Sequence, residues 1–183
     1  MLAYVFWHRP FAHADRRLYE AALVRFQGDL PRRKPPGFIA AGSFRIEPVP
    51  WLGDLPGYED WYLMEGSWAM DPLNASAITG ATQAPHDDVA ALMEEGHGGL
   101  YAHAGGEPLM AGQSTVHWLT RPRGIEWQAV LDPVRARHPR VNVWRRQMVL
   151  GPAAEFAVEA PDDAKIDLPS GWQALPVKRV KVA

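Results

Sequence analysis

Histidine is the residue type in this chain best suited to acid–base chemistry near neutral pH, because its unperturbed pKa is about 6.5. Among the seven histidines, His8 and His117 stand out, since each lies next to a tryptophan in an apolar, aromatic run that stops at Arg-Pro. Side chains alternate between the two faces of a strand, so His8 shares a face with Tyr4 and Phe6. Either histidine is a candidate general base. The alternative is a sheet histidine with no chemical role.

The tryptophans next to these histidines relate the two positions. If Trp7 and Trp118 are equivalent, His8 and His117 lie on the same face of equivalent strands. We then expect both histidines in one lumen, lined also by phenylalanine, tyrosine and at least one tryptophan. Alignment on the two Arg-Pro pairs instead shifts the register by one residue and requires a β-bulge.

Asp60 is the best carboxylate candidate to orient such a histidine or to accept a proton itself. Alternation along the predicted strand at residues 58–65 places Asp60 with Tyr58 and Tyr62, on the face opposite Glu59. Three neighbouring polar groups on a largely aromatic strand are costly to bury without partners. The alternative is that this face is solvated.

Sequence signals for metals, phosphates and covalent nucleophiles are weak or absent. The chain has no cysteine, which excludes disulfides, thiolate ligands and a cysteine nucleophile. It contains no His-Glu-x-x-His, Gly-x-Ser-x-Gly or Walker loop. We interpret Gly96-His97-Gly98-Gly99 as a turn, because it precedes a predicted strand instead of a helix. A haem would need an axial histidine, for which His117 or His138 could be nominated. We expect a colourless, metal-free protein without a cofactor.

Composition and charge narrow the class of protein. The chain has 183 residues, of which 47% are hydrophobic and 22% charged, as in ordinary globular proteins. Its net charge of −2 provides no electrostatic footprint for nucleic acid. The N-terminal run is too short for a signal peptide or a membrane span. We therefore expect a cytoplasmic protein without nucleic-acid or membrane partners. Its eight tryptophans suit either a core or a cavity wall.

Hydrophobic periodicity and chain breakers predict the elements that position these residues. Strands are predicted at residues 3–9, 38–47, 58–65, 98–104, 114–120, 141–150, 154–160 and 173–182. Helices are predicted at residues 16–30, 71–79, 87–95 and 125–132. The first half of the chain thus has the order β-α-β-β-α-β, and the second half repeats the beginning of that order.

The similarity of residues 4–10 to residues 115–122 suggests an internal duplication. It divides the chain into a first half at residues 1–112 and a shorter second half at residues 113–183. Related halves tend to pack across a pseudo-twofold axis. We predict that strands 3–9 and 114–120 occupy equivalent positions. Coincidence is the alternative.

The order β-α-β-β-α-β with antiparallel strands is the ferredoxin-like unit. Because of this order of elements and the similarity of the segments around Trp7 and Trp118, the chain resembles a single-chain version of the dimeric α/β-barrel superfamily. That superfamily includes antibiotic-biosynthesis monooxygenases, aromatic polyketide cyclases, stress-responsive barrels and chlorite-dismutase-like haem proteins. The resemblance implies an α+β fold of two ferredoxin-like halves whose antiparallel sheets form a pseudo-dimeric barrel. It also implies a cavity for a small aromatic or hydrophobic molecule.

Two hypotheses follow for function. The first is a cofactor-independent enzyme that abstracts a proton from a hydrophobic or aromatic small molecule, as a monooxygenase, cyclase or isomerase would. The second is a non-catalytic small-molecule-binding or stress-type barrel protein; in either case we expect a monomer or homodimer. A titratable group at the cavity floor favours the enzyme. The candidate residues are His8, His117 and Asp60 for proton transfer, and Phe6, Tyr58, Tyr62, Trp7 and Trp118 for substrate contact.

Overall fold

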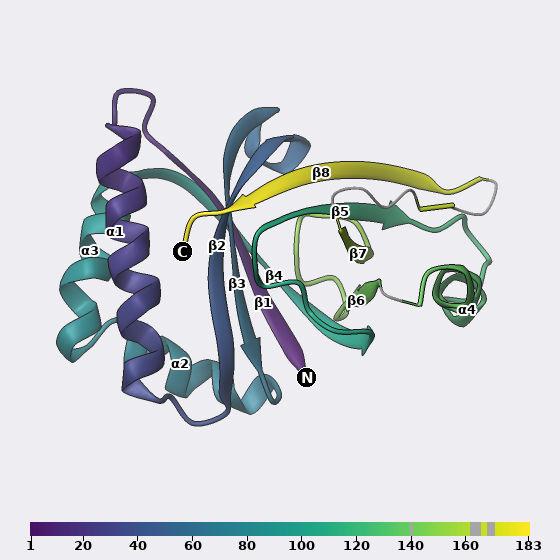
Figure 1. The fold of residues 1–183 in the computed structure, drawn as a ribbon, viewed down its shortest axis with the longest axis horizontal. Helices are drawn as coiled ribbons and strands as arrows, with labels where there is room; N and C mark the ends of the chain where they lie inside the picture. Colours follow the sequence, from purple (N-terminus) through teal and green to yellow (C-terminus); the bar gives the residue numbers. More distant parts are fainter. Residues whose placement is uncertain (140, 162–165, 168–170) are drawn as a thin grey trace.

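The computed structural model describes residues 1–139, 141–161, 166–167 and 171–183 (Figure 1). The strands are β1 (Leu2–Pro10), β2 (Phe38–Val49), β3 (Leu55–Met64), β4 (Met93–Gly105), β5 (Gln113–Thr120), β6 (Asn142–Arg146), β7 (Phe156–Pro161) and β8 (Gln173–Lys181). The α-helices are α1 (Arg16–Asp29), α2 (Met70–Ala77), α3 (Gln83–Leu92) and α4 (Gln128–Arg137). Within the described residues, no helix is long and apolar enough to cross a membrane.

The strands close into one antiparallel barrel in the order β1-β3-β2-β8-β5-β7-β6-β4. The first half of the chain contributes β4-β1-β3-β2 and the second half contributes β8-β5-β7-β6. Numbered within each half, both sheets have the strand order 4-1-3-2 of a ferredoxin-like unit. The predicted α+β fold of two ferredoxin-like halves in a pseudo-dimeric barrel is therefore confirmed. β1 and β5 hold the same position in their sheets; a duplication at residue 112 stays a prediction.

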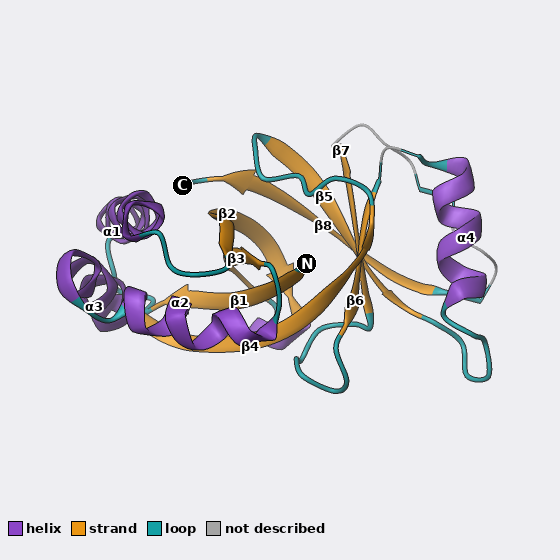
Figure 2. Ribbon diagram, turned by 90° about the horizontal axis from the view of Figure 1, so that it is seen from below, coloured by secondary structure: helices purple, strands orange, loops and turns teal. Residues whose placement is uncertain are grey.

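The helices cover the barrel at two opposite ends. Figures 1 and 2 show α1, α2 and α3 together against the first sheet, while α4 lies at the far end against the second. α1 begins after Asp15, as predicted, because that carboxylate accepts a hydrogen bond of 2.7 Å from the backbone N–H of Arg17. Its apolar face, with Tyr19, Leu23 and Phe26, is turned to the first sheet.

The barrel interior is a packed core, not an open lumen. Trp7, Trp61, Trp118 and Trp144 are each at most 1% exposed, and their rings contact one another inside the barrel. Such large side chains fill the small interior that eight strands enclose. A binding cavity must therefore lie outside the barrel, between a sheet and its helices.

Three local predictions are wrong. The strand expected at residues 141–150 ends at Arg146. The helix expected at residues 87–95 ends at Leu92, and β4 starts directly at Met93. The predicted turn Gly96-His97-Gly98-Gly99 is part of β4, where Gly96 pairs with His8 and Gly98 pairs with Phe6. Glycine is a poor strand former in isolation, but here the ladder to β1 and the need for space above these residues outweigh that preference.

Candidate functional site

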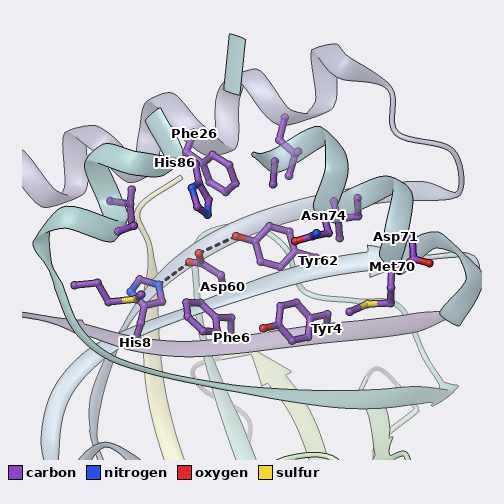
Figure 3. Close-up of a pocket in the computed structure, with 16 residues that line it drawn as sticks. Tyr4, Phe6, His8, Phe26, Asp60, Tyr62, Met70, Asp71, Asn74 and His86 are labelled. Carbon is purple, nitrogen blue, oxygen red and sulfur yellow. Dashed lines mark hydrogen bonds and ion pairs between the residues drawn. The ribbon is translucent and has the colours of Figure 1, made fainter. Parts of the chain in front are cut away.

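A pocket of about 410 Å³ lies between the outer face of the first sheet and helices α1 to α3 (Figure 3). Its volume is in the range of small-molecule sites. Side chains from β1 and β3 form the floor, and side chains from the three helices form the opposite wall. The lining residues are Tyr4, Phe6, His8, Phe26, Leu30, Asp60, Tyr62, Met70, Asp71, Leu73, Asn74, Ala77, His86, Val89, Ala90 and Met93.

Two glycines of β4 shape the aromatic floor. A Cβ atom at Gly96 would lie 2.5 Å from the Phe6 ring, and one at Gly98 would lie 2.6 Å from the Tyr4 ring. No real side chain tolerates such contacts, so both rings can lie across β4 only because these residues are glycine. The Tyr4 and Phe6 rings are stacked, with centroids 6.2 Å apart. They form a flat apolar surface suited to an aromatic ligand.

A buried histidine–carboxylate pair lies at one end of this floor. His8 Nε2 is 3.2 Å from Asp60 Oδ1, and the two residues are 1% and 3% exposed. Nε2 has no hydrogen-bond partner in the described part of the chain. Strand pairing explains the proximity, because Phe6 is opposite Asp60 and His8 is opposite Tyr58 in the β1–β3 ladder.

Neutral hydroxyl groups donate hydrogen bonds to both oxygens of the Asp60 carboxylate. Ser43 donates to Oδ1 at 2.5 Å, and Tyr62 donates to Oδ2 at 3.0 Å. Gln27 of α1 donates through Nε2 to both Ser43 Oγ and Tyr62 Oη, at 3.0 and 3.1 Å. Since buried polar groups are costly unless paired, this network holds Asp60 in one position.

His8 is fixed by aromatic rings and one hydroxyl. Its Nδ1 is 2.5 Å from Tyr19 Oη. The Tyr58 ring stacks on the imidazole at 5.6 Å between centroids, and the Phe6 ring stacks at 5.3 Å. The ring therefore keeps one orientation, with Nε2 directed to the Asp60 side (Figure 3).

The tyrosine hydroxyls around the pair remain protonated at neutral pH. Burial, followed by the charge of Asp60, raises the pKa of Tyr4 and that of Tyr19 above the ordinary value. Burial also raises the pKa of Tyr62 well above its usual range, and Asp60 adds to the effect. All three hydroxyls can therefore donate a proton in a hydrogen bond.

The structure brings four of the predicted site residues into one pocket: His8, Asp60, Phe6 and Tyr62. Tyr58 is not one of the lining residues, but its ring stacks on the imidazole of His8. Tryptophans do not line the pocket, contrary to expectation: Trp7 and Trp118 are in the barrel core, 5.3 Å apart between ring centroids. The strand faces that carry His8 and His117 were expected to face the lumen. The bulky indoles on the opposite faces fill the interior instead, so the histidine faces lie outside the barrel.

The expectation that His8 and His117 share one lumen is also wrong. His117 lies on β5, opposite Val158 of β7 and Pro176 of β8, and does not line the pocket. Its Nε2 is buried without a hydrogen-bond partner in the described residues. Burial, with a smaller contribution from His138, lowers the pKa of His117.

Sequence reasoning missed the residues that support the pair. These residues are Tyr19, Gln27 and Ser43, none of which is a candidate site residue by sequence pattern alone. Gln27 is 6% exposed on the helix face turned to the sheet. A polar residue in line with the apolar positions Tyr19, Leu23 and Phe26 was the available signal, because such a residue needs a buried partner.

Comparisons with known proteins identify the fold. No protein-family model and no curated protein matches the chain. Among solved structures, a protein from Lactobacillus acidophilus assigned as a monooxygenase matches with a TM-score of 0.62 at 10% identity, over 100% of this chain and 94% of that one. A protein assigned as a chlorite dismutase matches with a TM-score of 0.51 at 9% identity, over 98% and 94% of the two chains. A mutant chlorite dismutase from Candidatus Nitrospira defluvii gives 0.52 at 6% identity, over 99% and 92%.

These matches span almost all of each chain. The protein has the dimeric α/β-barrel fold. Its resemblance to that superfamily is confirmed at the level of fold. The neighbours include proteins named as enzymes, but fold alone does not transfer a reaction.

The haem of chlorite-dismutase-like barrels can be tested against the residues present. An axial histidine needs a nitrogen free to point into an open cavity. In the pocket, His8 directs Nδ1 to Tyr19 and Nε2 to the Asp60 side. His117 lies on the other sheet, where Val134 of α4 packs in one apolar cluster with Leu119. Within the described residues, no group of three or more His, Cys, Asp or Glu side chains could hold a metal ion. His8, with both nitrogens directed to protein groups, does not fit as an axial haem ligand.

Proposed function

We propose that the protein is an enzyme that abstracts a proton from a hydrophobic or aromatic small molecule held in this pocket, using its own side chains. The observation that supports this proposal is the buried His8–Asp60 pair at the floor of an aromatic cavity. A pocket that only sequestered an apolar ligand would not need two buried titratable groups, which are costly to desolvate.

His8 is the proton acceptor in this proposal. When Nδ1–H donates to Tyr19 Oη, Nε2 carries the lone pair that accepts the substrate proton in this proposal; Nε2 is buried beside Asp60, so the substrate must reach it by displacing that contact. Proton transfer to Nε2 creates an imidazolium 3.2 Å from the Asp60 carboxylate. The Asp60 carboxylate at that distance compensates the positive charge that forms on the ring during proton transfer. Asp60 thus positions and stabilises His8.

Tyr4 is the hydroxyl best placed to stabilise the negative charge left on the substrate. Its Oη makes no hydrogen bond in the described part of the chain, and its ring lies in the pocket floor. Tyr62 is already engaged with Asp60 and Gln27. A preorganised hydroxyl donor in a water-poor site stabilises an enolate or phenolate oxygen as it forms. The resulting carbanion can then isomerise, cyclise or react with O₂.

A non-catalytic binding protein is the second candidate. Both nitrogens of His8 already face protein groups, and the pair is almost completely buried. In that case the network only stabilises the floor, and the pocket binds a hydrophobic molecule without changing it.

Solvent-deuterium exchange separates the two functions. Enolisable aromatic ketones such as 2-tetralone are incubated with the protein in D₂O, and loss of the carbon-bound proton is followed by NMR. We expect exchange above the buffer rate, and a loss of about 10²–10⁴-fold in His8→Gln. His117→Gln is the matched control, because it changes the same residue type on the equivalent strand of the other sheet. Ligand binding without exchange, unchanged in His8→Gln, would favour the binding protein.

A further inference from the structure

The pocket carries acidic side chains and no permanently cationic ones. Its described lining contains Asp60 and Asp71, and neither lysine nor arginine. The only ion-pair partner of Asp60 among the described residues is His8, which is charged only when protonated. Arg45, which is opposite Tyr58 in the β2–β3 ladder, donates to Glu20 through Nε at 3.0 Å. The permanently charged side chains of the described lining are therefore all acidic, and only His8 and His86, when protonated, add positive charge to it.

This charge distribution excludes one class of ligand. A carboxylate or phosphate entering the pocket would lose its hydration and meet Asp60 without any guanidinium or ammonium group to compensate. Like-charge contact in a desolvated site disfavours the wrong ligand strongly. Anionic aromatic acids are thus poor substrates on physical grounds.

The opposite end of the pocket suits a cation. Asp71 lies in the first turn of α2, at the end of the pocket remote from His8 (Figure 3). Asp71 is exposed, so it can pair with a cation while both groups keep part of their hydration. The faces of Tyr4, Phe6 and Tyr62 between the two ends also attract a cation, through their π-electrons.

We propose that the ligand is an aromatic molecule that bears a protonated amine, with the amine at Asp71 and the reacting C–H group at His8. This inference rests on the proposed function for the orientation of the ligand. The expected preference for a cationic ligand does not depend on the proposed function. Asn74, one turn after Asp71 on α2, adds a polar side chain at the same end.

Binding of three naphthalenes of similar shape tests the charge preference. The probes are 2-(aminomethyl)naphthalene, 2-methylnaphthalene and 2-naphthoate, and affinities are measured by isothermal titration calorimetry with the full chain. We expect the amine to bind most tightly and the carboxylate at least tenfold more weakly than the amine. Equal or tighter binding of the carboxylate would overturn the inference.

A charge-neutral variant locates the amine. Asp71→Asn is expected to weaken binding of the amine about threefold, the range of one exposed ion pair, and to leave binding of 2-methylnaphthalene unchanged. Asp132→Asn is the matched control, since it makes the same charge change on α4 at the other end of the molecule. An equal effect of both variants, or no effect of Asp71→Asn, would overturn the assignment to Asp71. Because these readouts are affinities, a failure of deuterium exchange alone leaves this inference standing and counts only against catalysis.

Discussion

Glu59 and Asp60 are consecutive residues of β3 whose carboxylates lie on opposite faces of the first sheet. Asp60 faces the pocket and His8, whereas Glu59 points into the barrel, where Arg179 donates to it at 3.3 Å. Trp7 and Trp61 also donate to Glu59 through their indole N–H groups, at 2.9 and 2.6 Å. Strand alternation thus separates two buried carboxylates, one available to a ligand and one enclosed in the core.

This arrangement predicts different effects for the same substitution at the two positions. Asp60→Asn removes the charge that stabilises protonated His8, so the rate of deuterium exchange should fall by about 10²-fold or more. Glu59→Gln should leave the exchange rate within a few-fold of wild type and mainly lower the free energy of unfolding. Exchange kinetics and urea unfolding of both variants check this. Equal losses of exchange would show that Asp60 acts only through stability.

The pocket floor provides a second prediction. Gly98→Ala places a methyl group 2.6 Å from the Tyr4 ring, which must then move toward the cavity. Overpacking of this kind costs about 1–3 kcal/mol of stability. Because the displaced ring takes up space in the pocket, the affinity for naphthalene ligands should fall about tenfold, which is about 1.4 kcal/mol.

Gly28→Ala in α1 is the control for Gly98→Ala. Nothing lies within 4 Å of its added methyl group. It should leave affinity unchanged and stabilise the helix by about 0.5–1 kcal/mol. Calorimetry and thermal unfolding check both variants. Unchanged affinity in Gly98→Ala would mean that Tyr4 does not border the ligand.

Period-2 and period-3.6 patterns were enough to predict the strand and helix order, and from it the ferredoxin-like halves. They also placed Asp60, Tyr58 and Tyr62 on one face of β3. The patterns could not tell which face is inside the barrel, because both faces of β3 are buried. That ambiguity produced the mistaken shared lumen for His8 and His117.

Two further features depend on contacts between residues distant in sequence. Gly96 and Gly98 were interpreted as a turn because glycine marks turns more often than strands, and only the rings of β1 above them explain their place in β4. Likewise, Arg179 alternates with apolar residues in the last strand, a pattern typical of a strand with one solvated face, yet it is 1% exposed. The closure of the barrel by β8 between β2 and β5 encloses it.

The lowered pKa of His117 predicts a pH effect on stability. Because the folded-state pKa lies below the ordinary value of about 6.5, the unfolded chain binds the proton more readily. His117 thus contributes stability that is present above pH 6.5 and is lost as pH falls through the folded-state pKa.

The comparison of wild type with His117→Gln tests this effect. Between pH 8 and pH 5, the free energy of unfolding of wild type should fall more than that of His117→Gln. Urea unfolding at a series of pH values measures it. A difference that is independent of pH would contradict the burial of the imidazole.

The last prediction concerns the charged network that joins the two sheets inside the barrel. Arg179 of β8 donates to Glu59 of β3 and to Glu159 of β7, and all three are at most 1% exposed. Removal of one partner from a buried ion pair leaves an uncompensated charge and costs about 3–5 kcal/mol. Arg179→Met should therefore lower the free energy of unfolding by about that amount. Arg16→Met, at an exposed arginine of α1, should change it by less than about 0.5 kcal/mol.

A combined variant separates the charge effect from lost packing, because Arg179 also stacks over the Phe44 ring at 4.2 Å. Addition of Glu59→Gln and Glu159→Gln to Arg179→Met removes both unpaired carboxylates. The amide oxygens still accept the indole N–H groups of Trp7 and Trp144, and the hydrogen bond from Trp61 to the second oxygen of Glu59 is lost. The triple variant should then be more stable than Arg179→Met alone, which is a coupling that additive effects cannot produce. Urea unfolding of the single, double and triple variants measures it. A triple variant less stable than Arg179→Met would show that stacking and shape, and not charge pairing, determine the contribution of Arg179 to the barrel.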